Sequence, residues 1–592
     1  MDIRQIRLLH LRQRMRQENI KAYIIPTGDY HSSEYVSDYY KVREFYSGFT
    51  GSNGMLVVFD NEAGLFTDGR YFIQAERELG GSGIDLYRMG EEKVPTVFEY
   101  LESRVGQGMK LAGNGKVMSF SFAEEVQRVC EKTGCDFLTD INIAEELFEN
   151  RPDRPCGRIR QLPIELTGET TAMKLSRVRE ELAKAGCDGM FLSRLDDIMW
   201  LFNIRGEDVP YNPVALSYAF LDHERAVLFI QNLSELQTDL FMVRSYDEVD
   251  VWLKNELSLE QKIAVDPKSV SRFFYELISQ HAKAVKIQNP VMLLKAVKNE
   301  TEIRNLREIY RKDSAAVIKF IYWLKKSIKN QAITEIDAVE YLHRKREEID
   351  EFMGESFQTI SAYRANAAMM HYEPVTERPV TVLAEGMLLV DSGGQYLGGT
   401  TDVTRTIVLG EISDEEKLHF TKVAAGMLRL SAAKFPEGCT GRNLDILARQ
   451  PLWELGIDYK CGTGHGIGYM LNVHEDPQAV RWKPTDRSVD GILKAGMLLS
   501  NEPGVYIENG YGIRTENVLL VREDEKTADG QFLSFETLTF VPIDLEAVDV
   551  EKLDERDKRL LNEYHRSVYK NTSDLLTEEE AAWLREAVRP VV

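Results

Sequence analysis

The sequence predicts an α/β protein with two related N-terminal domains, a larger third domain and a helical C-terminal extension. Three observations predict this organisation. Strand and helix patterns alternate along the chain, the order of elements in residues 8–60 recurs from about residue 170, and long amphipathic helices begin near Lys298. With 592 residues, the chain has room for three or four domains.

The first predicted domain spans residues 1–155. Residues 8–19 have helical spacing, and Ala22–Pro26, Met55–Phe59 and residues 64–68 read as strands. Glycine-rich turns are expected at residues 48–54 and 68–70.

The second predicted domain, residues 156–298, repeats that order. A helix opening at Val178 precedes a strand at 189–193, an aromatic turn at 200–206 and a strand at Ala226–Ile230. Two prolines and three charges in residues 151–155 resist regular structure and mark the boundary between the two domains.

The third predicted domain spans residues 299–545 and begins with two amphipathic helices, at 300–329 and 334–349, the second with Thr334 or Asp337 as its cap. Strands and helices then alternate. The extension, residues 546–592, is charged and helical, and Thr577-Glu578-Glu579-Glu580 fits a capping box. We expect it to pack on the third domain or on a partner subunit.

Composition excludes several classes of protein. A formal charge of −22 argues against nucleic-acid binding, which needs basic surfaces. No apolar run reaches the ~18 residues of a membrane span, and the start of the chain does not have the pattern of a signal peptide. The six cysteines are scattered, as reduced thiols usually are. We therefore expect a cytoplasmic protein.

Carboxylates lie at the ends of apolar runs in two distant parts of the third domain. Asp391 and Asp402 are predicted on adjacent strands of one hairpin, and Glu502 and Glu516 recur in the same way downstream. Any one of them could belong to a turn or a salt bridge. Four carboxylates buried together require cations, and two divalent ions would balance their charge. Because both hairpins show the same carboxylate pattern, we expect an internal pseudo-twofold arrangement with metals on its axis.

Histidines complete the candidate site. His465, in a glycine run that does not match Gly-x-Gly-x-x-Gly, could supply a nitrogen ligand, and its glycines would let the backbone approach the metals. Four carboxylates with one imidazole suit Mn²⁺, Co²⁺ or Zn²⁺ and do not choose among them. His371 and His474 lie near these motifs. Each is either a structural histidine or a group that holds a substrate carbonyl.

These motifs resemble the pita-bread metallopeptidases, the family of methionine aminopeptidase, prolidase and aminopeptidase P. Within that family, the chain is most similar to the three-domain cytosolic Xaa-Pro aminopeptidases, whose two N-terminal domains are creatinase-like. The resemblance covers nearly the whole chain. It is carried by Leu389-Val390-Asp391-Ser392-Gly393, Thr401-Asp402-Val403-Thr404-Arg405, Gly464-His465-Gly466, Asn472-Val473-His474-Glu475, Glu502-Pro503-Gly504, Arg514-Thr515-Glu516-Asn517 and, in the first domain, Thr67-Asp68-Gly69-Arg70.

The resemblance implies a role for each site residue. Asp391 would bind one metal, His465 and Glu502 the other, and Asp402 and Glu516 both. A hydroxide between two ions, with Mn²⁺ as the first choice, would attack the Xaa-Pro bond, and Glu502 would shuttle the proton. His371, His474 and Arg70 would bind substrate, and Arg514 would orient a ligand from behind. The implied substrates are peptides with proline in second position, and the implied assembly is a homodimer.

Two alternatives stay open. A prolidase-like dipeptidase uses the same catalytic fold, although prolidases typically carry a single N-terminal domain. A metal-free peptide-binding scaffold would have lost ligands that this chain retains. The sequence departs from the family before His371, where Met369 and Met370 replace branched residues, and at Asp476, where relatives often carry glycine. These departures bear on the preferred first residue and not on the metal site.

Overall fold

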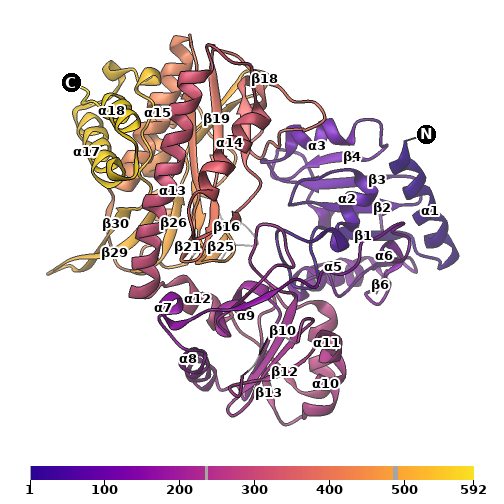
Figure 1. Ribbon diagram of the computed structural model, residues 1–592. Helices are drawn as coiled ribbons and strands as arrows, with labels where there is room; N and C mark the ends of the chain where they lie inside the picture. The colour runs from indigo at the N-terminus through magenta and orange to yellow at the C-terminus, as the bar shows by residue number, and fades with distance from the viewer. Residues whose placement is uncertain (1, 234–235, 237, 484–490) are drawn as a thin grey trace. The chain divides into compact units, whose positions relative to one another are not determined.

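A computed structural model describes residues 2–233, 236, 238–483 and 491–592 (Figure 1). The chain forms two compact units, one of residues 1–164 and 169–291 and the other of residues 165–168 and 292–592. Each is a mixed α/β structure, so the predicted fold class is confirmed.

The first unit contains two six-stranded sheets. The first sheet has the order β4-β3-β2-β1-β5-β6. Its central strand β1 runs antiparallel to β2 and parallel to β5, and the outer pairs β3–β4 and β5–β6 are parallel. The strands are β1 Ala22–Pro26, β2 Met55–Phe59, β3 Ala63–Thr67, β4 Asp85–Arg88, β5 Lys110–Gly113 and β6 Asp136–Leu138.

The second sheet repeats the first, with the order β12-β11-β10-β8-β13-β14. Its central strand β8 is antiparallel to β10 and parallel to β13, and the outer pairs are again parallel. The predicted duplication is therefore confirmed. The strands are β8 Gly189–Leu192, β10 Ser217–Asp222, β11 Ala226–Ile230, β12 Met242–Ser245, β13 Lys262–Val265 and β14 Lys283–Lys286.

Helices flank both sheets. Two expectations were wrong: the start of the helix near Val178 and the aromatic turn at 200–206. The helix expected to open at Val178 begins earlier, because Thr170 caps it through the backbone N–H of Met173. The aromatic turn expected at 200–206 is the end of α9 followed by strand β9, Ile204–Gly206, which pairs with β7, Ile159–Gln161. The main helices are α1 Ile3–Gln17, α2 Val42–Ser47, α3 Phe72–Leu79, α4 Val97–Glu102, α5 Phe120–Thr133, α8 Thr171–Lys184, α9 Leu195–Leu201, α10 Val249–Glu256 and α11 Arg272–His281.

The second unit opens with α12, Pro290–Ala296, whose last five residues belong to it, and the long helix α13, Glu300–Ser327. Thr334 is the N-cap of α14, Glu335–Glu347, and Asp337 completes its capping box, so the two candidate caps act together. The apolar face of α13 packs against β19 and β22, with Phe320, Leu324 and Leu388 fully buried.

Two sheets of the second unit carry the candidate site. The three-stranded sheet β17-β19-β22 consists of Ile360–Tyr363, Met387–Ser392 and Val403–Val408. The six-stranded sheet has the order β23-β30-β29-β26-β24-β25. Its strands are β23 Lys434–Pro436, β24 Gly464–Gly466, β25 Glu475–Val480, β26 Leu498–Asn501, β29 Asn517–Thr527 and β30 Gly530–Thr537.

The C-terminal extension packs on this unit. Packing on the third domain was one of the two expectations, the other being packing on a partner subunit. Helix α17, Glu555–Thr572, lies beside α15, Asp414–Ser431, and α18, Glu578–Ala587, lies beside α13 (Figure 1). Their buried residues Leu561, Val568 and Leu584 join the same core as α15. Thr577 and Glu580 form the predicted capping box at the start of α18.

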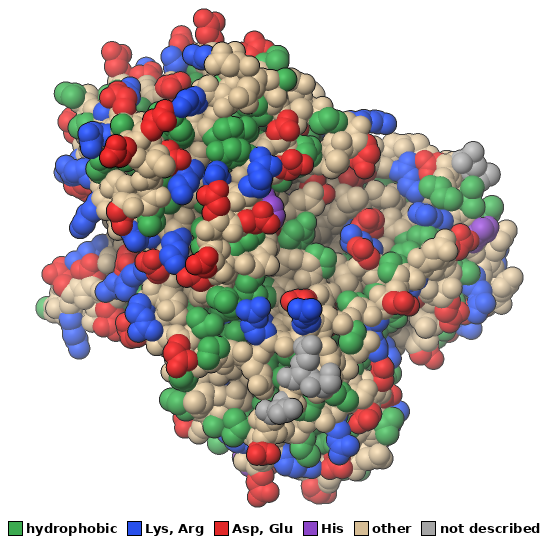
Figure 2. Space-filling view, viewed as in Figure 1, with side chains coloured by type: hydrophobic (Ala, Val, Ile, Leu, Met, Phe, Trp, Pro, Cys, Tyr) green, Lys and Arg blue, Asp and Glu red, His purple; other side chains and the backbone are tan. Residues whose placement is uncertain are grey.

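The surface is mixed in charge. On the face in Figure 2, acidic and basic side chains are interspersed, and no broad basic patch gathers there. Among the described residues, no helix combines the length and apolar character that crossing a bilayer requires.

Candidate metal centre

The first carboxylate pair lies on neighbouring strands of the three-stranded sheet. Asp391, near the end of β19, is opposite Thr404 of the antiparallel strand β22, and Asp402 directly precedes β22. A small hairpin of β20, Gly394–Tyr396, and β21, Gly399–Thr400, is inserted between them. Both aspartates are buried, and the expected adjacency of the two strands is confirmed.

The second pair has the same arrangement. Strands β26 and β29 run antiparallel with Asn501 opposite Asn517. Glu502 follows the first of these residues and Glu516 precedes the second, so both glutamates leave the sheet at the same place. The intervening chain forms the hairpin of β27, Gly504–Ile507, and β28, Tyr511–Arg514.

The structure brings both pairs together around His465. Ligand-type atoms of Asp402, His465 and Glu516 all lie within 4.8 Å of one another. The His465 Nε2 atom is 3.5 Å from Asp402 Oδ2 and 3.4 Å from Glu502 Oε1. Asp391 is close enough that its charge acts on the other three carboxylates. The carboxylates from two distant segments therefore converge on one point.

Burial and mutual repulsion disfavour the charged forms of these groups. The pKa of Asp402 is raised well above its usual range by burial, and further by Glu516 and Asp391. Burial likewise raises the pKa of Glu516, with Glu502 and Asp391 adding to it. Burial raises the pKa of Glu502 to about 7, although Arg514 opposes that rise. Arg514 compensates only part of this negative charge, and bound cations would compensate the rest.

The unused hydrogen-bonding capacity of the site fits metal ligation. Asp391 Oδ1 and Glu516 Oε1 are buried and accept no hydrogen bond from any residue that the structure describes, an arrangement that is costly without another partner. Two other carboxylate oxygens are held in place by hydrogen bonds from hydroxyl groups. Thr404 Oγ1 donates to Glu516 Oε2 at 2.7 Å and Ser500 Oγ to Glu502 Oε1 at 3.1 Å. Four carboxylates and one imidazole suit Mn²⁺, Co²⁺ or Zn²⁺.

His465 is held with Nε2 towards the carboxylates. Its Nδ1 lies 2.9 Å from the carbonyl oxygen of Gly466, which favours a proton on Nδ1 and an electron pair on Nε2. The flanking glycines allow this strand to fit: a Cβ atom at Gly464 would lie 1.9 Å from Ser500 O, and one at Gly466 would lie 2.3 Å from Glu475 O. The glycines thus let β24 fit between β25 and β26. That they also bring the backbone near the metals stays a prediction.

Arg514 lies behind Asp391. Its Nη2 donates to Asp391 Oδ2 at 2.5 Å, its Nη1 to Tyr506 Oη at 2.8 Å and its Nε to Thr404 Oγ1 at 3.1 Å. Sequence reasoning found Arg514 but missed Thr404, Ser500 and Tyr506. Two of these are hydroxyl residues within two positions of a predicted ligand, which was the available signal for them.

The three other predicted site residues, His474, His371 and Arg70, lie in different parts of the structure. The ring centroid of His474 lies 4.3 Å from that of His465, nearly perpendicular to it. Half-buried His371 follows Met370, whose carbonyl oxygen accepts a hydrogen bond from Arg514. Arg70 belongs to the first unit, where Asp68 binds its Nε and Nη2 atoms at 2.9 Å each.

The fold and the site together define a metallohydrolase of the pita-bread type. The sequence pattern described as metallopeptidase family M24 matches residues 304–523, and that of its C-terminal region matches residues 531–591. Two patterns described as creatinase/prolidase N-terminal domains match residues 7–143 and 150–302. The chain belongs to metallopeptidase family M24, in the aminopeptidase P branch that carries two creatinase-type N-terminal domains.

Full-length relatives support this assignment. "Probable Xaa-Pro aminopeptidase P" of Metarhizium acridum is 38% identical over 616 residues, which cover 99% of each chain. "Xaa-Pro aminopeptidase 1" of Dictyostelium discoideum is 35% identical and covers 98% of this chain and 96% of its own. The crystal structure of an X-prolyl aminopeptidase from Caenorhabditis elegans, described as a cytosolic enzyme with a di-nuclear active site, has a TM-score of 0.91 at 35% identity and covers 97% of this chain and 95% of its own.

Proposed function

We propose that the chain is an Xaa-Pro aminopeptidase, which removes the first residue from peptides with proline in second position. The convergence of Asp391, Asp402, His465, Glu502 and Glu516 carries this proposal. It occurs in a chain that is similar over its whole length to proteins named as Xaa-Pro aminopeptidases. The sequence-based expectation and the comparisons agree on this activity.

The site would hold two divalent ions. Asp391 would bind one and His465 with Glu502 the other, while Asp402 and Glu516 would bridge both. The di-nuclear site named for the Caenorhabditis elegans enzyme supports this number. Mn²⁺ is our first choice, with Co²⁺ and Zn²⁺ as alternatives. Bound there, the ions would lower the pKa of water from 15.7 to about 7 and so supply a nucleophile at neutral pH.

The protein's own groups would handle protons and substrate. Glu502 would shuttle the proton, as the family resemblance implies. It is buried, and in the metal-free protein burial raises its pKa to about 7. His474, whose ring lies beside that of His465, and His371 would hold the substrate carbonyl by hydrogen bonds.

Proline in second position is compatible with this chemistry. The bond before proline is a tertiary amide without an N–H, so the site must accept a ring and need not offer that nitrogen an acceptor. The ions would also hold the free amino terminus of the peptide, which would limit cleavage to the first bond.

We further propose domain boundaries after residues 155, 298 and 545, a cytoplasmic location and a homodimer. The extents of the matched family patterns and the description of the Caenorhabditis elegans enzyme as cytosolic support the first two. Sedimentation analysis would test the dimer. Arg70, whose contacts lie within the first unit, remains a proposed substrate-binding residue, and the KM of an Arg70→Ala variant for tripeptides would test it.

Peptide cleavage separates this function from its alternatives. Metal-stripped protein supplied with Mn²⁺, Co²⁺ or Zn²⁺ should release arginine from Arg-Pro-Pro. Cleavage of a simple Xaa-Pro dipeptide with none of the tripeptide would instead indicate a prolidase, an outcome that the duplicated N-terminal domain disfavours. Binding without cleavage, together with no bound metal after purification without chelator, would indicate a scaffold.

A further inference from the structure

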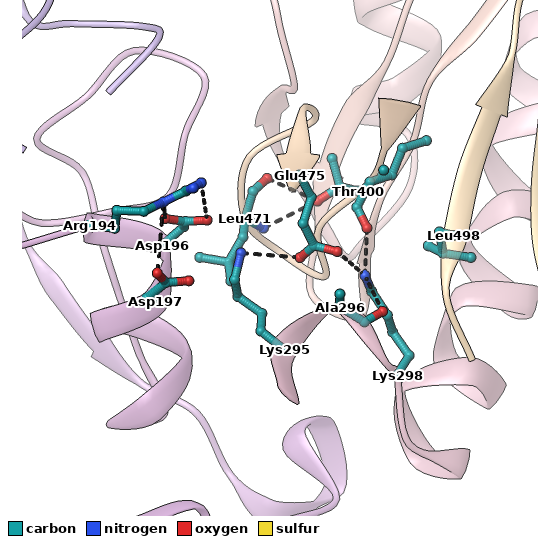
Figure 3. Close-up of polar contacts among 12 residues, drawn as sticks. Arg194, Asp196, Asp197, Lys295, Ala296, Lys298, Thr400, Leu471, Glu475 and Leu498 are labelled. Atoms are coloured by element: carbon teal, nitrogen blue, oxygen red, sulfur yellow. Dashed lines mark hydrogen bonds and ion pairs between the residues drawn. The ribbon is translucent and has the colours of Figure 1, made fainter. Parts of the chain in front are cut away.

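A cluster of buried charges lies next to His474 and has no part in the function proposed above. The Glu475 side chain is 0% exposed and forms ion pairs with Lys295 and Lys298, which are 2% and 0% exposed (Figure 3). Lys295 lies in the last turn of α12, and Lys298 lies in the short segment between α12 and α13. Burying ammonium groups is unfavourable unless they are paired and hydrogen-bonded, so these contacts constrain the surrounding chain closely.

Lys298 joins the two ends of one loop. Its Nζ donates to the carbonyl oxygen of Ile467 at 2.7 Å, and the same atom is in close contact with Glu475 Oε1. A third bond, to Ala296 O at 3.2 Å, ties the ammonium to its own segment. Ile467 directly follows β24, and Glu475 is the first residue of β25. This ammonium group therefore links the two ends of the loop of residues 467–475, beside the strand pairing of Gly466 with Glu475.

The middle of this loop is anchored separately. Gln395 Nε2 donates to Leu471 O at 2.8 Å. The backbone N–H of Leu471 donates to Thr400 Oγ1 at 3.3 Å, and both of these residues are labelled in Figure 3. Met470 has a left-handed backbone with φ of 51°, a conformation that the surrounding contacts must hold in place. The loop is therefore fixed at its centre by these bonds, and at its ends by the strand pairing of Gly466 with Glu475 and by Lys298.

His474 lies at the end of this loop, immediately before Glu475, whereas His465 has its own supports. The His465 N–H donates to Ser500 Oγ at 3.0 Å, and His465 pairs with Ala479 across the sheet. Loss of the Lys298 contacts would therefore release His474 more than His465.

We propose that Lys298 is a positioning residue, which holds the His474 imidazole against the metal centre by closing the loop of residues 467–475 through Glu475 and Ile467. The inference rests on the proposed function for its catalytic consequence. Its structural part, the closed loop, stands on the contacts alone. Buried ion pairs are often replaceable by apolar residues without loss of stability, so the cluster's value lies in the geometry it imposes.

The test compares Lys298→Met with Lys325→Met. The first substitution leaves the Lys295–Glu475 pair at 3.4 Å, so the buried carboxylate keeps a cation. The second removes Lys325, which lies in helix α13, outside the loop, and pairs with Asp544 at 2.6 Å. Hydrogen exchange followed by mass spectrometry should show faster exchange in residues 467–475 for Lys298→Met only. Unchanged exchange there, or an increase spread over the whole chain, would overturn the proposal.

Activity measured in two backgrounds tests the consequence. Lys298→Met should lower kcat/KM for Arg-Pro-Pro by about 10- to 100-fold, the range for partners that orient a site group, with the bound metal unchanged. In a His474→Ala background it should cause little further loss. An equal loss in both backgrounds, or loss of metal, would contradict the role assigned to Lys298.

A second variant keeps the test decisive if Lys298→Met does not fold. Glu475→Gln preserves the side chain's shape and removes its charge, and it should show the same local increase in exchange; unchanged exchange would count against the proposal. If the wild-type protein cleaves no Xaa-Pro peptide, the proposed function fails on its own. The exchange measurement then decides the positioning role alone.

Discussion

Replacing Asp402 with asparagine should have opposite effects on the metal-free and the metal-loaded protein. The side chain is buried among Glu516, Asp391 and Glu502, and burial together with these charges raises its pKa well above the usual range. Asp402→Asn removes one negative charge and keeps the shape. Without metal it should stabilise the fold, and with metal it should remove a bridging ligand.

The structure sets the size of the first effect. Two unit charges at the 4.8 Å limit that separates the ligand atoms repel by about 3.5 kcal/mol at an effective dielectric constant of about 20. Sharing of protons among the carboxylates relieves part of that repulsion. We therefore expect the stripped Asp402→Asn protein to be more stable than the stripped wild type by roughly 1–3 kcal/mol.

The second effect follows from linkage. A ligand present at 100 times its dissociation constant stabilises the folded protein by about 2.7 kcal/mol per site. Mn²⁺ should therefore raise the stability of the wild type and have a much smaller effect on Asp402→Asn. Activity on Arg-Pro-Pro should be lost.

Denaturant unfolding of chelator-stripped proteins, with and without MnCl₂, measures both effects. Asp529→Asn is the matched control, because Asp529 is exposed and its change should stay within about 0.5 kcal/mol. A stripped Asp402→Asn protein less stable than stripped wild type, or one that Mn²⁺ stabilises as strongly, would refute the reasoning.

Three further outcomes are expected. His474→Ala should lower kcat for Xaa-Pro peptides by about 100- to 1,000-fold with metal content unchanged; steady-state kinetics with metal analysis would show an unaltered rate if the role is wrong. Arg514→Met should weaken metal binding about 10- to 100-fold, because the guanidinium orients Asp391; a metal titration that matches wild type would exclude this. Burial lowers the pKa of His565 to about 3 from 6.5, so the unfolded chain binds the extra proton between these values. The contribution of His565 to the stability of the fold is therefore complete above pH 6.5. Below that pH, the free energy of unfolding should fall by up to about 1.4 kcal/mol per pH unit. His565→Gln should flatten that fall in urea unfolding, and identical profiles would contradict the assignment.

Local patterns predicted much of the fold. The apolar runs Ala22–Pro26, Met55–Phe59 and Ala226–Ile230 are strands with these bounds, because such runs between turn residues suit buried positions in a sheet. The recurrence near residue 170 correctly indicated a second copy of the first sheet. The start of the helix near Val178 was misplaced because the capping hydroxyl of Thr170 was overlooked.

The candidate site was predictable in its membership and less so in its supports. Each carboxylate stands at a strand end, so the hairpin pattern alone placed Asp391 beside Asp402 and Glu502 beside Glu516. That the two hairpins meet depends on long-range packing, which local patterns do not encode. The expectation rested on the repeated carboxylate pattern and on the need for cations among buried carboxylates, and the family resemblance supported it. The contacts of Lys298 with Ile467 and Glu475 join positions about 170 residues apart in sequence. No local sequence pattern predicts these contacts.

An anomalous-scattering crystal structure of the Mn²⁺-loaded protein tests the central claim most directly. We predict two peaks, about 3.5–4 Å apart as in other two-metal sites, with Asp402 and Glu516 touching both, Asp391 touching one, and His465 and Glu502 touching the other. A single peak, or peaks away from these five side chains, would contradict the account.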